Sequence, residues 1–144
     1  MKISMKGDYG VRALVELAHR YGDGPVQSST IASRQSIPEP YLDQLLTSLR
    51  RAGFIRSVRG PQGGHALIRD PRELRLSEVV GALEGSLAPI GCLDDPNGCR
   101  MASTCTLKPV WQAIEEATIR VLDSITIADL AERERAGTVA RYSI

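Results

Sequence analysis

The sequence predicts a mainly α-helical protein with one small β hairpin, arranged as a winged helix-turn-helix followed by a long dimerisation helix. Three observations lead to this prediction. Three segments with helical periodicity open the chain, of which the second is short and the third is amphipathic. Two short segments on either side of a Gly-rich turn follow, as in a β hairpin. A later segment, residues 107–125, carries an apolar stripe that the preceding residues cannot easily cover, so a partner chain is its natural cover.

Local signals place the boundaries of each element in chain order. We expect helices over 9–21, 28–35, from 40 to a cap at Gly53, 77–85 and 107–125, and strands over 54–59 and 65–68. Ser28 or Ser29 can cap the second helix, and Ser77 can cap the fourth. Pro40 suits the first turn of the third helix, because its missing N–H would have no partner there anyway.

Charge divides the chain into two unequal parts. Residues 1–75 hold 12 Lys/Arg and 7 Asp/Glu, a net charge of +5, whereas residues 76–144 hold 6 and 10, a net charge of −4. A basic first half indicates a head that binds a polyanion. We therefore expect a DNA-binding head over 1–76, a loop and dimerisation helix over 77–131, and a charged, mobile tail over 132–144.

No segment of the sequence has the character of a signal peptide or of a membrane span. It has no N-terminal apolar segment suited to secretion and no run of 18 apolar residues. We expect a cytoplasmic protein with no membrane partner. Thiols stay reduced in that compartment, so clustered cysteines there tend to bind metals or to catalyse.

All three cysteines, Cys92, Cys99 and Cys105, lie in residues 86–106, a stretch rich in Gly, Pro and Asp that has no periodicity and is called the cysteine loop below. A loop of this length is usually functional or disordered. An odd number of thiols fits poorly with a closed set of disulfides. The clustering instead favours a soft-metal or iron–sulfur site, for which a fourth ligand must come from elsewhere.

The third predicted helix supplies the candidate base-reading residues, because this helix of a helix-turn-helix enters the major groove with its N-terminal residues near the base edges. The candidates are Glu39, Pro40, Tyr41, Asp43 and Gln44. A carboxylate from Glu39 or Asp43 can accept a hydrogen bond from cytosine, and Gln44 can pair with adenine. For Tyr41, as for the leucines of this helix, the core is the more typical place.

The second helix and the hairpin supply the candidate phosphate contacts. Ser28, Ser29 and Thr30 open the second helix, where hydroxyls and free amides meet phosphate. Arg56, Arg59 and Arg69 are the candidate basic residues around the hairpin, whose Gly-rich tip begins at Gly60. Arg59 beside such a narrow turn is suited to the minor groove.

Two other functional classes fit the residues less well. A protein-docking module would need more aromatic anchors than the 4% of Phe, Trp and Tyr in this chain. An enzyme would need a nucleophile–base pair, and the sequence offers only two scattered histidines.

Specific stretches of the chain resemble a known family. Residues 1–9 (MKISMKGDY), Ile37-Pro38 with Tyr41-Leu42, and above all residues 57–64 (SVRGPQGG) resemble the Rrf-two family of bacterial winged-helix regulators, from residue 1 to about residue 131. The resemblance implies a homodimer that is joined through 107–125 and binds a partly palindromic DNA operator, most often as a repressor. Members include regulators of iron–sulfur cluster biogenesis, nitric-oxide-sensitive repressors, iron-responsive repressors, and regulators of cysteine metabolism that hold no cluster.

The spacing of the thiols resembles that of the cluster-binding branches. The biogenesis regulators carry a histidine where this chain has Lys108, which is a poor ligand for iron. The nitric-oxide-sensitive branch resembles this chain at Asp8, which implies that a carboxylate of the other subunit is the fourth ligand. Possible substitutes are Glu84, Asp94, Asp95 and His65.

The resemblance therefore implies a repressor whose operator affinity depends on an iron–sulfur cluster that senses nitric oxide, iron or redox state. Three thiolates and a carboxylate favour [4Fe-4S] over [2Fe-2S]. The alternative is a cluster-free thiol or zinc switch on the same DNA-binding head.

Overall fold

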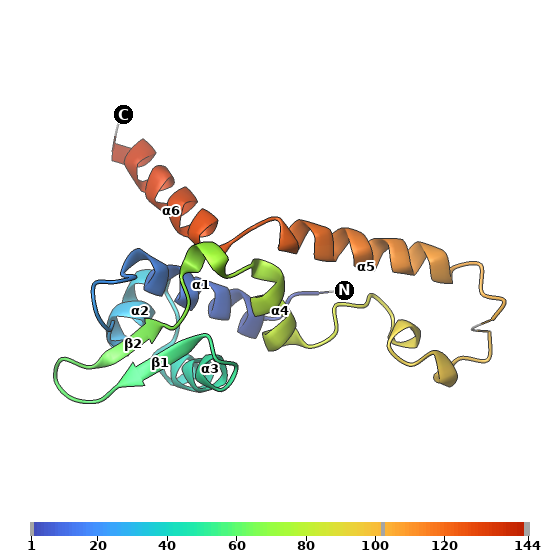
Figure 1. The fold of residues 1–144 in the computed structure, drawn as a ribbon, viewed down its shortest axis with the longest axis horizontal. Helices are drawn as coiled ribbons and strands as arrows, with labels where there is room; N and C mark the ends of the chain where they lie inside the picture. Colours follow the sequence, from blue (N-terminus) through green and yellow to red (C-terminus); the bar gives the residue numbers. More distant parts are fainter. Residues whose placement is uncertain (1, 102, 143–144) are drawn as a thin grey trace.

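The computed structural model describes residues 2–101 and 103–142 of the chain. In chain order its elements are α1 (Met5–His19), α2 (Ser28–Gln35), α3 (Glu39–Arg51), β1 (Ile55–Val58), β2 (Gly64–Leu67), η1 (Pro71–Glu73), α4 (Leu76–Glu84), η2 (Gly91–Leu93), η3 (Pro96–Gly98), α5 (Lys108–Asp123) and α6 (Ile127–Tyr142). The predicted fold class, mainly α with one hairpin, is confirmed. Helix α5 and the cysteine loop extend to one side of the head (Figure 1).

Helix α1 is the centre of the head and contacts α2, α3, α4 and α6. It begins at Met5, before the predicted start at residue 9, because the Ser4 hydroxyl accepts a hydrogen bond from the Gly7 amide and caps the helix. Its apolar face is part of one hydrophobic core that α2, α3, the hairpin, α4 and α6 share. The largest fully buried apolar side chains are Leu14, Leu17, Ile31, Leu42, Leu49, Ile55, Leu74, Ile127 and Val79.

Helices α2 and α3 form the helix-turn-helix. Ser36 ends α2 in the left-handed conformation, with φ of 55°, and Pro38 precedes the first turn of α3. The buried face of α3 consists of four leucines at helical spacing, Leu42, Leu45, Leu46 and Leu49. Burial of this face leaves the opposite face of α3 exposed. The helix lies beside the hairpin (Figure 1).

The predicted serine caps are wrong, because each serine has a partner across the fold. Gln27 is the N-cap of α2 and Arg75 is that of α4, and neither side chain makes a capping hydrogen bond. The Ser28 hydroxyl lies against His65 of β2. The Ser77 hydroxyl donates to Asp123 at the end of α5.

Strands β1 and β2 pair antiparallel, from Ile55 opposite Leu67 to Val58 opposite Gly64. The segment before α2 joins this hairpin, because the Val26 amide donates to the His65 carbonyl and the His65 amide donates back, both at 2.8 Å. Gly64 allows this approach, since a Cβ atom there would lie 2.4 Å from the Val26 carbonyl oxygen. The hairpin is therefore fixed to the start of the helix-turn-helix.

The cysteine loop leaves α4 and returns through α5, and the segment made of α4, the loop and α5 is closed at its far ends. The C-terminal end of α5 lies against the N-terminal end of α4. The Leu76 amide donates to the Ile125 carbonyl at 2.8 Å, and the Ile127 amide donates to the Leu74 carbonyl at 2.9 Å. Arg75 adds a hydrogen bond of 2.7 Å to the Asp123 carbonyl.

Residues 132–142 continue helix α6, which the sequence patterns do not predict, and the mobility of this tail stays a prediction; residues 143–144 lie outside the described residues. The helix begins with a reciprocal cap, in which the Thr126 amide donates to Asp129 and the Asp129 amide donates to the Thr126 hydroxyl. These bonds lower the pKa of Asp129. Helix α6 packs on α1 through Ile127 and Ala131.

Among the residues that the structure describes, no helix is long and apolar enough to cross a membrane.

Candidate nucleic-acid interface and cysteine loop

The first turns of α3 present most of the predicted base-reading residues to solvent. Glu39, Pro40, Asp43 and Gln44 are exposed. The fifth candidate, Tyr41, is half-buried and packs edge-on against the Tyr9 ring, with ring centroids 5.6 Å apart. Tyr41 therefore anchors α3 on α1, and the exposed members of the set have the freedom to meet a base edge.

The start of α2 presents hydroxyls and backbone amides. Ser29 is exposed, and Ser28 and Thr30 are half-buried. The Gln27 side chain makes no capping bond, whereas the Thr30 amide already donates to the Gln27 carbonyl at 3.0 Å. The first amides of α2 thus remain available to an anion, and the helix dipole favours a negative charge at this end.

The hairpin carries the basic side chains that the sequence predicts at its surface. Arg56, Arg59 and Gly60 are all exposed. Arg69, farther along the chain, is not available in the same way, because its guanidinium makes two hydrogen bonds, at 2.7 and 3.2 Å, to the Glu78 carboxylate. This pair raises the pKa of Arg69 and lowers that of Glu78.

A hydrogen-bonded series of four side chains connects α2, α3 and the hairpin, and the sequence did not reveal it. Arg50 of α3 donates to the Ser57 hydroxyl at 3.3 Å, and Ser57 lies 2.9 Å from Nδ1 of His65. Nε2 of His65 lies 3.0 Å from the Ser28 hydroxyl. Both ring nitrogens therefore have partners on the head, which argues against His65 as a substitute iron ligand.

All three cysteines of the loop are free thiols and half-buried. Cys92 lies within η2, Cys99 directly follows η3, and Cys105 lies shortly before α5. Tight turns shape the loop: the Asp94 amide donates to the Gly91 carbonyl and the Gly98 amide donates to the Asp95 carbonyl, each at 3.1 Å. Three sulfur donors in one loop are of the type that an iron–sulfur cluster binds, although in the described residues of one chain they do not lie within 4.8 Å of one another.

Asp8 occupies the first turn of α1 and is half-buried. Its carboxylate accepts a hydrogen bond of 2.8 Å from Nε of Arg12, which raises the pKa of that arginine. In the described part of one chain, Asp8 belongs to no set of three ligand atoms within 4.8 Å of one another. Asp8 and the thiols of the same chain thus form no site for a single ion.

The remaining substitute ligands differ in availability. The Glu84 carboxylate accepts from the Ser4 amide at 2.9 Å and from the Ser4 hydroxyl at 2.7 Å, so it holds the start of α1 against the end of α4. Asp94 and Asp95 are exposed within the cysteine loop itself.

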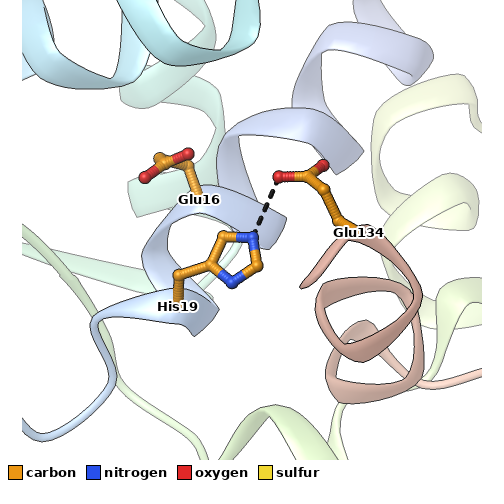
Figure 2. Close-up of side chains that lie close together, drawn as sticks. All are labelled: Glu16, His19 and Glu134. Atoms are coloured by element: carbon orange, nitrogen blue, oxygen red, sulfur yellow. Dashed lines mark hydrogen bonds and ion pairs between the residues drawn. The ribbon is translucent and has the colours of Figure 1, made fainter. Parts of the chain in front are cut away.

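Glu16, His19 and Glu134 form a separate cluster between α1 and α6 (Figure 2). One ligand atom from each lies within 4.8 Å of the others. Nε2 of His19 lies 2.9 Å from the Glu134 carboxylate, and Arg135 approaches Nδ1 of His19 at 3.3 Å. An arginine only donates, so Nδ1 accepts and Nε2 carries the hydrogen, whereas a histidine that binds a metal usually donates its second N–H to an acceptor.

Basic and amide donors already compensate the carboxylates of this cluster. Gln35 of α2 donates to both Glu16 and Glu134 at 3.1 Å. The second oxygen of buried Glu16 has no well-directed hydrogen bond, but Nε of Arg34 forms an ion pair with it at 3.0 Å. The cluster is therefore a polar network that joins α6 to α1 and α2.

Comparison with known proteins agrees with the fold. The model of the Rrf2 family, described as an iron-dependent transcriptional regulator, matches residues 3–133. The regulator IscR of Serratia proteamaculans is 34% identical and covers 97% of this chain and 85% of its own. The structure of T. potens IscR is 41% identical, covers 93% of this chain and 88% of its own, and gives a TM-score of 0.75. The structure of CymR, titled the global cysteine regulator of B. subtilis, is 37% identical and gives a TM-score of 0.77. The match covers 92% of this chain and 98% of the CymR chain.

These matches extend over the DNA-binding head, the cysteine loop and α5, and the relatives are transcriptional regulators rather than enzymes. They also support the DNA-binding interpretation of the head over that of a protein-docking module. The chain belongs to the Rrf2 family of transcriptional regulators.

Proposed function

We propose that the protein is a homodimeric repressor whose operator affinity is controlled by an iron–sulfur cluster that senses nitric oxide, iron or redox state. The observation that carries this proposal is the cysteine loop, which presents three free, half-buried thiols between α4 and α5, two helices whose far ends are hydrogen-bonded to each other. The iron-dependent description of the matching family agrees with it. Within this proposal residues 1–76 bind DNA, and residues 77–131 hold the cluster and the dimer contact.

Cys92, Cys99 and Cys105 would hold the cluster, with Asp8 of the partner subunit as the fourth ligand. [4Fe-4S] is favoured over [2Fe-2S] for this donor set. When bound, the cluster would supply an iron with one weak oxygen ligand, open to nitric oxide, to oxygen or to loss under iron limitation. The Asp8 carboxylate accepts a hydrogen bond from Arg12, and it would have to give up that bond in order to bind the iron with the same oxygen.

The exposed apolar stripe of α5 supports a dimer. Val110 is 49% exposed, Ile114 40% and Val121 60%, and the helix has no buried residue. A contiguous apolar patch of this kind marks an interaction surface. A second copy of the chain would cover the stripe with its own α5.

The loop can influence the head through α4. This helix packs on α1, and Glu84 at its end holds the start of α1 through Ser4. Ordering or release of the loop would act on α4 and on the relative placement of the two heads.

The decisive experiment is anaerobic purification and reconstitution, followed by analysis of iron and sulfide, visible absorption spectroscopy and operator selection with and without the cluster. We expect stoichiometric iron and sulfide and a change in operator affinity when the cluster is removed. A colourless protein whose affinity does not change with iron would contradict the proposal. Asp8→Ala should leave the cluster bound but more labile, and Asp23→Ala is a control on an exposed carboxylate outside the candidate ligands.

The second candidate is a cluster-free zinc or thiol switch on the same DNA-binding head. The likeness to a cysteine regulator of B. subtilis favours it. Zinc that copurifies without sulfide, or a change in affinity on thiol oxidation alone, would select this candidate.

A further inference from the structure

We propose that His65 is a positioning residue for DNA binding, which directs the Ser28 hydroxyl to donate its proton to a backbone phosphate. The inference rests on the proposed DNA-binding role of the head. It assigns a function to a side chain that need not touch DNA itself.

The geometry places His65 between three elements that face DNA. Its ring bridges Ser28 at the start of α2 and Ser57 on β1, at 3.0 and 2.9 Å, and Ser57 in turn accepts from Arg50 of α3. The backbone of His65 is fixed by its two hydrogen bonds to Val26, the residue just before the N-cap of α2. The ring therefore has a constrained position relative to the start of α2.

The chemistry of the donors gives the series of hydrogen bonds a direction. A guanidinium only donates, so the Ser57 hydroxyl accepts a hydrogen bond from Arg50. This polarises the hydroxyl, which is then suited to donate a hydrogen bond to Nδ1 of His65. With Nδ1 as acceptor, a neutral imidazole carries its hydrogen on Nε2 and donates it to Ser28. The Ser28 hydroxyl then keeps its own proton for an outside acceptor. In the opposite tautomer Ser28 would donate to Nε2 and could offer no proton to a phosphate oxygen.

The surroundings keep the ring neutral, as this arrangement requires. Burial lowers the pKa of His65, and the nearby charge of Arg50 lowers it further, while Asp43 acts in the opposite direction. Both charged groups belong to α3, the helix that packs beside the hairpin. Near neutral pH one ring nitrogen therefore donates and the other accepts.

A double-mutant cycle on a double-stranded DNA fragment of mixed sequence tests the inference, because a phosphate contact does not depend on base sequence. Ser28→Ala should weaken binding about tenfold for each bound head, the value of one hydrogen bond to a charged oxygen. His65→Ala should cause a similar loss. The double variant should bind no more weakly than either single variant, because His65 acts through Ser28.

Ser29→Ala is the matched control. It removes a neighbouring hydroxyl at the same helix end, but Ser29 makes no hydrogen bond to His65 in the described structure. The affinity losses of Ser29→Ala and His65→Ala should therefore multiply in the double variant. The salt dependence should not change for Ser28→Ala or His65→Ala, because neither substitution removes a positive charge.

Two further measurements separate positioning from a structural role. Nitrogen-15 NMR should show an unprotonated Nδ1 and a protonated Nε2 for His65, which is readily assigned because the chain has only two histidines. Ser57→Ala changes an exposed hydroxyl outside the core, so the head should stay folded. It should weaken DNA binding by less than His65→Ala and disturb the tautomer.

The inference would be overturned if the affinity losses of Ser28→Ala and His65→Ala multiply in the double variant, or if Nδ1 of His65 carries the hydrogen. Neither result would contradict DNA binding by the head. If the unaltered protein fails to bind the duplex at all, both this inference and the proposed function of the head fail. The two results are distinguishable in the same titration.

Discussion

Individual side chains on the head divide into those that carry positive charge and those that carry hydrogen-bonding groups for bases. Arg56 and Arg59 are exposed on the hairpin, and Asp43 and Gln44 are exposed on α3. An arginine that neutralises a phosphate contributes to the affinity for any DNA, whereas an amide or carboxylate at a base edge contributes only to a particular sequence. The two groups should therefore respond differently to salt and to operator changes.

Arg59→Ala should reduce the salt slope of DNA binding by about 0.9 for each head, because one fewer counterion is released. The loss should be similar across sequences, unless Arg59 enters a narrow minor groove and favours A·T-rich flanks. Titrations at several salt concentrations measure this slope. Arg72→Ala is a control, because that guanidinium is engaged by Asp70 at 2.7 Å.

Gln44→Ala should instead cost on the order of 1–3 kcal/mol at one base position and relax the preference there. Asp43→Ala should do the same at another position. Binding assays with operator variants measure the loss of affinity at each base position. Equal losses across all variants would mean that α3 does not read bases in this way.

The low pKa of His65 predicts a pH dependence of stability. In the unfolded chain the imidazole titrates near 6.5, while burial and Arg50 lower its pKa in the folded protein. Between these two values the unfolded state binds more protons, so the free energy of unfolding should fall as pH falls through this window and level off below it. Urea denaturation across this range should show a flatter dependence for His65→Asn. An identical dependence in the variant would rule out this contribution.

At the scale of elements, the boundaries that the sequence could predict are those with a local cause. Pro40 in the first turn of α3 and Gly53 just after it, with φ of 83°, are local signals, and the observed helix follows them closely. The predicted serine caps failed because the partner of each hydroxyl lies far along the chain, as Ser28 meets His65. Helix α6 was not predicted, because its packing against α1 exists only in the folded head.

The site follows the same division. The exposure of the α3 and hairpin residues could be predicted from helical and strand periodicity. The hydrogen bonds of His65 to Ser28 and Ser57 could not be predicted, because these partners are 37 and 8 residues away in the sequence and meet the ring only in the folded head. The polar network around Glu16 was missed for the same reason, since Gln35 and Glu134 reach it from two other helices.

The cysteine loop should behave as an element that can lose its cluster and keep the fold. Changing any one of Cys92, Cys99 or Cys105 to Ala should abolish stable cluster binding and leave a folded dimer, because no cysteine belongs to the hydrophobic core. Iron and sulfide analysis with circular dichroism measures both properties. A variant that retains full iron, or that fails to fold without it, would contradict the assignment.

At the scale of the whole molecule, α5 is the surface that a single chain leaves incomplete. Ile114 lies midway along its exposed apolar stripe. Ile114→Asp would bury an unpaired carboxylate in a dimer and should weaken association by about 3 kcal/mol or more. Analytical ultracentrifugation measures the change. Gln112→Asp, at an exposed polar position on the same helix, should leave the dimer intact.

The two hydrogen bonds that join Leu74 and Leu76 to Ile127 and Ile125 close the chain into a ring that contains α4, the cysteine loop and α5. A chain whose two ends are joined explores a smaller volume than a free chain of the same length. Loss of order in the cysteine loop would therefore gain less entropy than loss of order in a free tail of equal length. A cofactor that left the loop would leave all three thiols tethered within one closed segment, and the ring would act as a receptacle that can be loaded again.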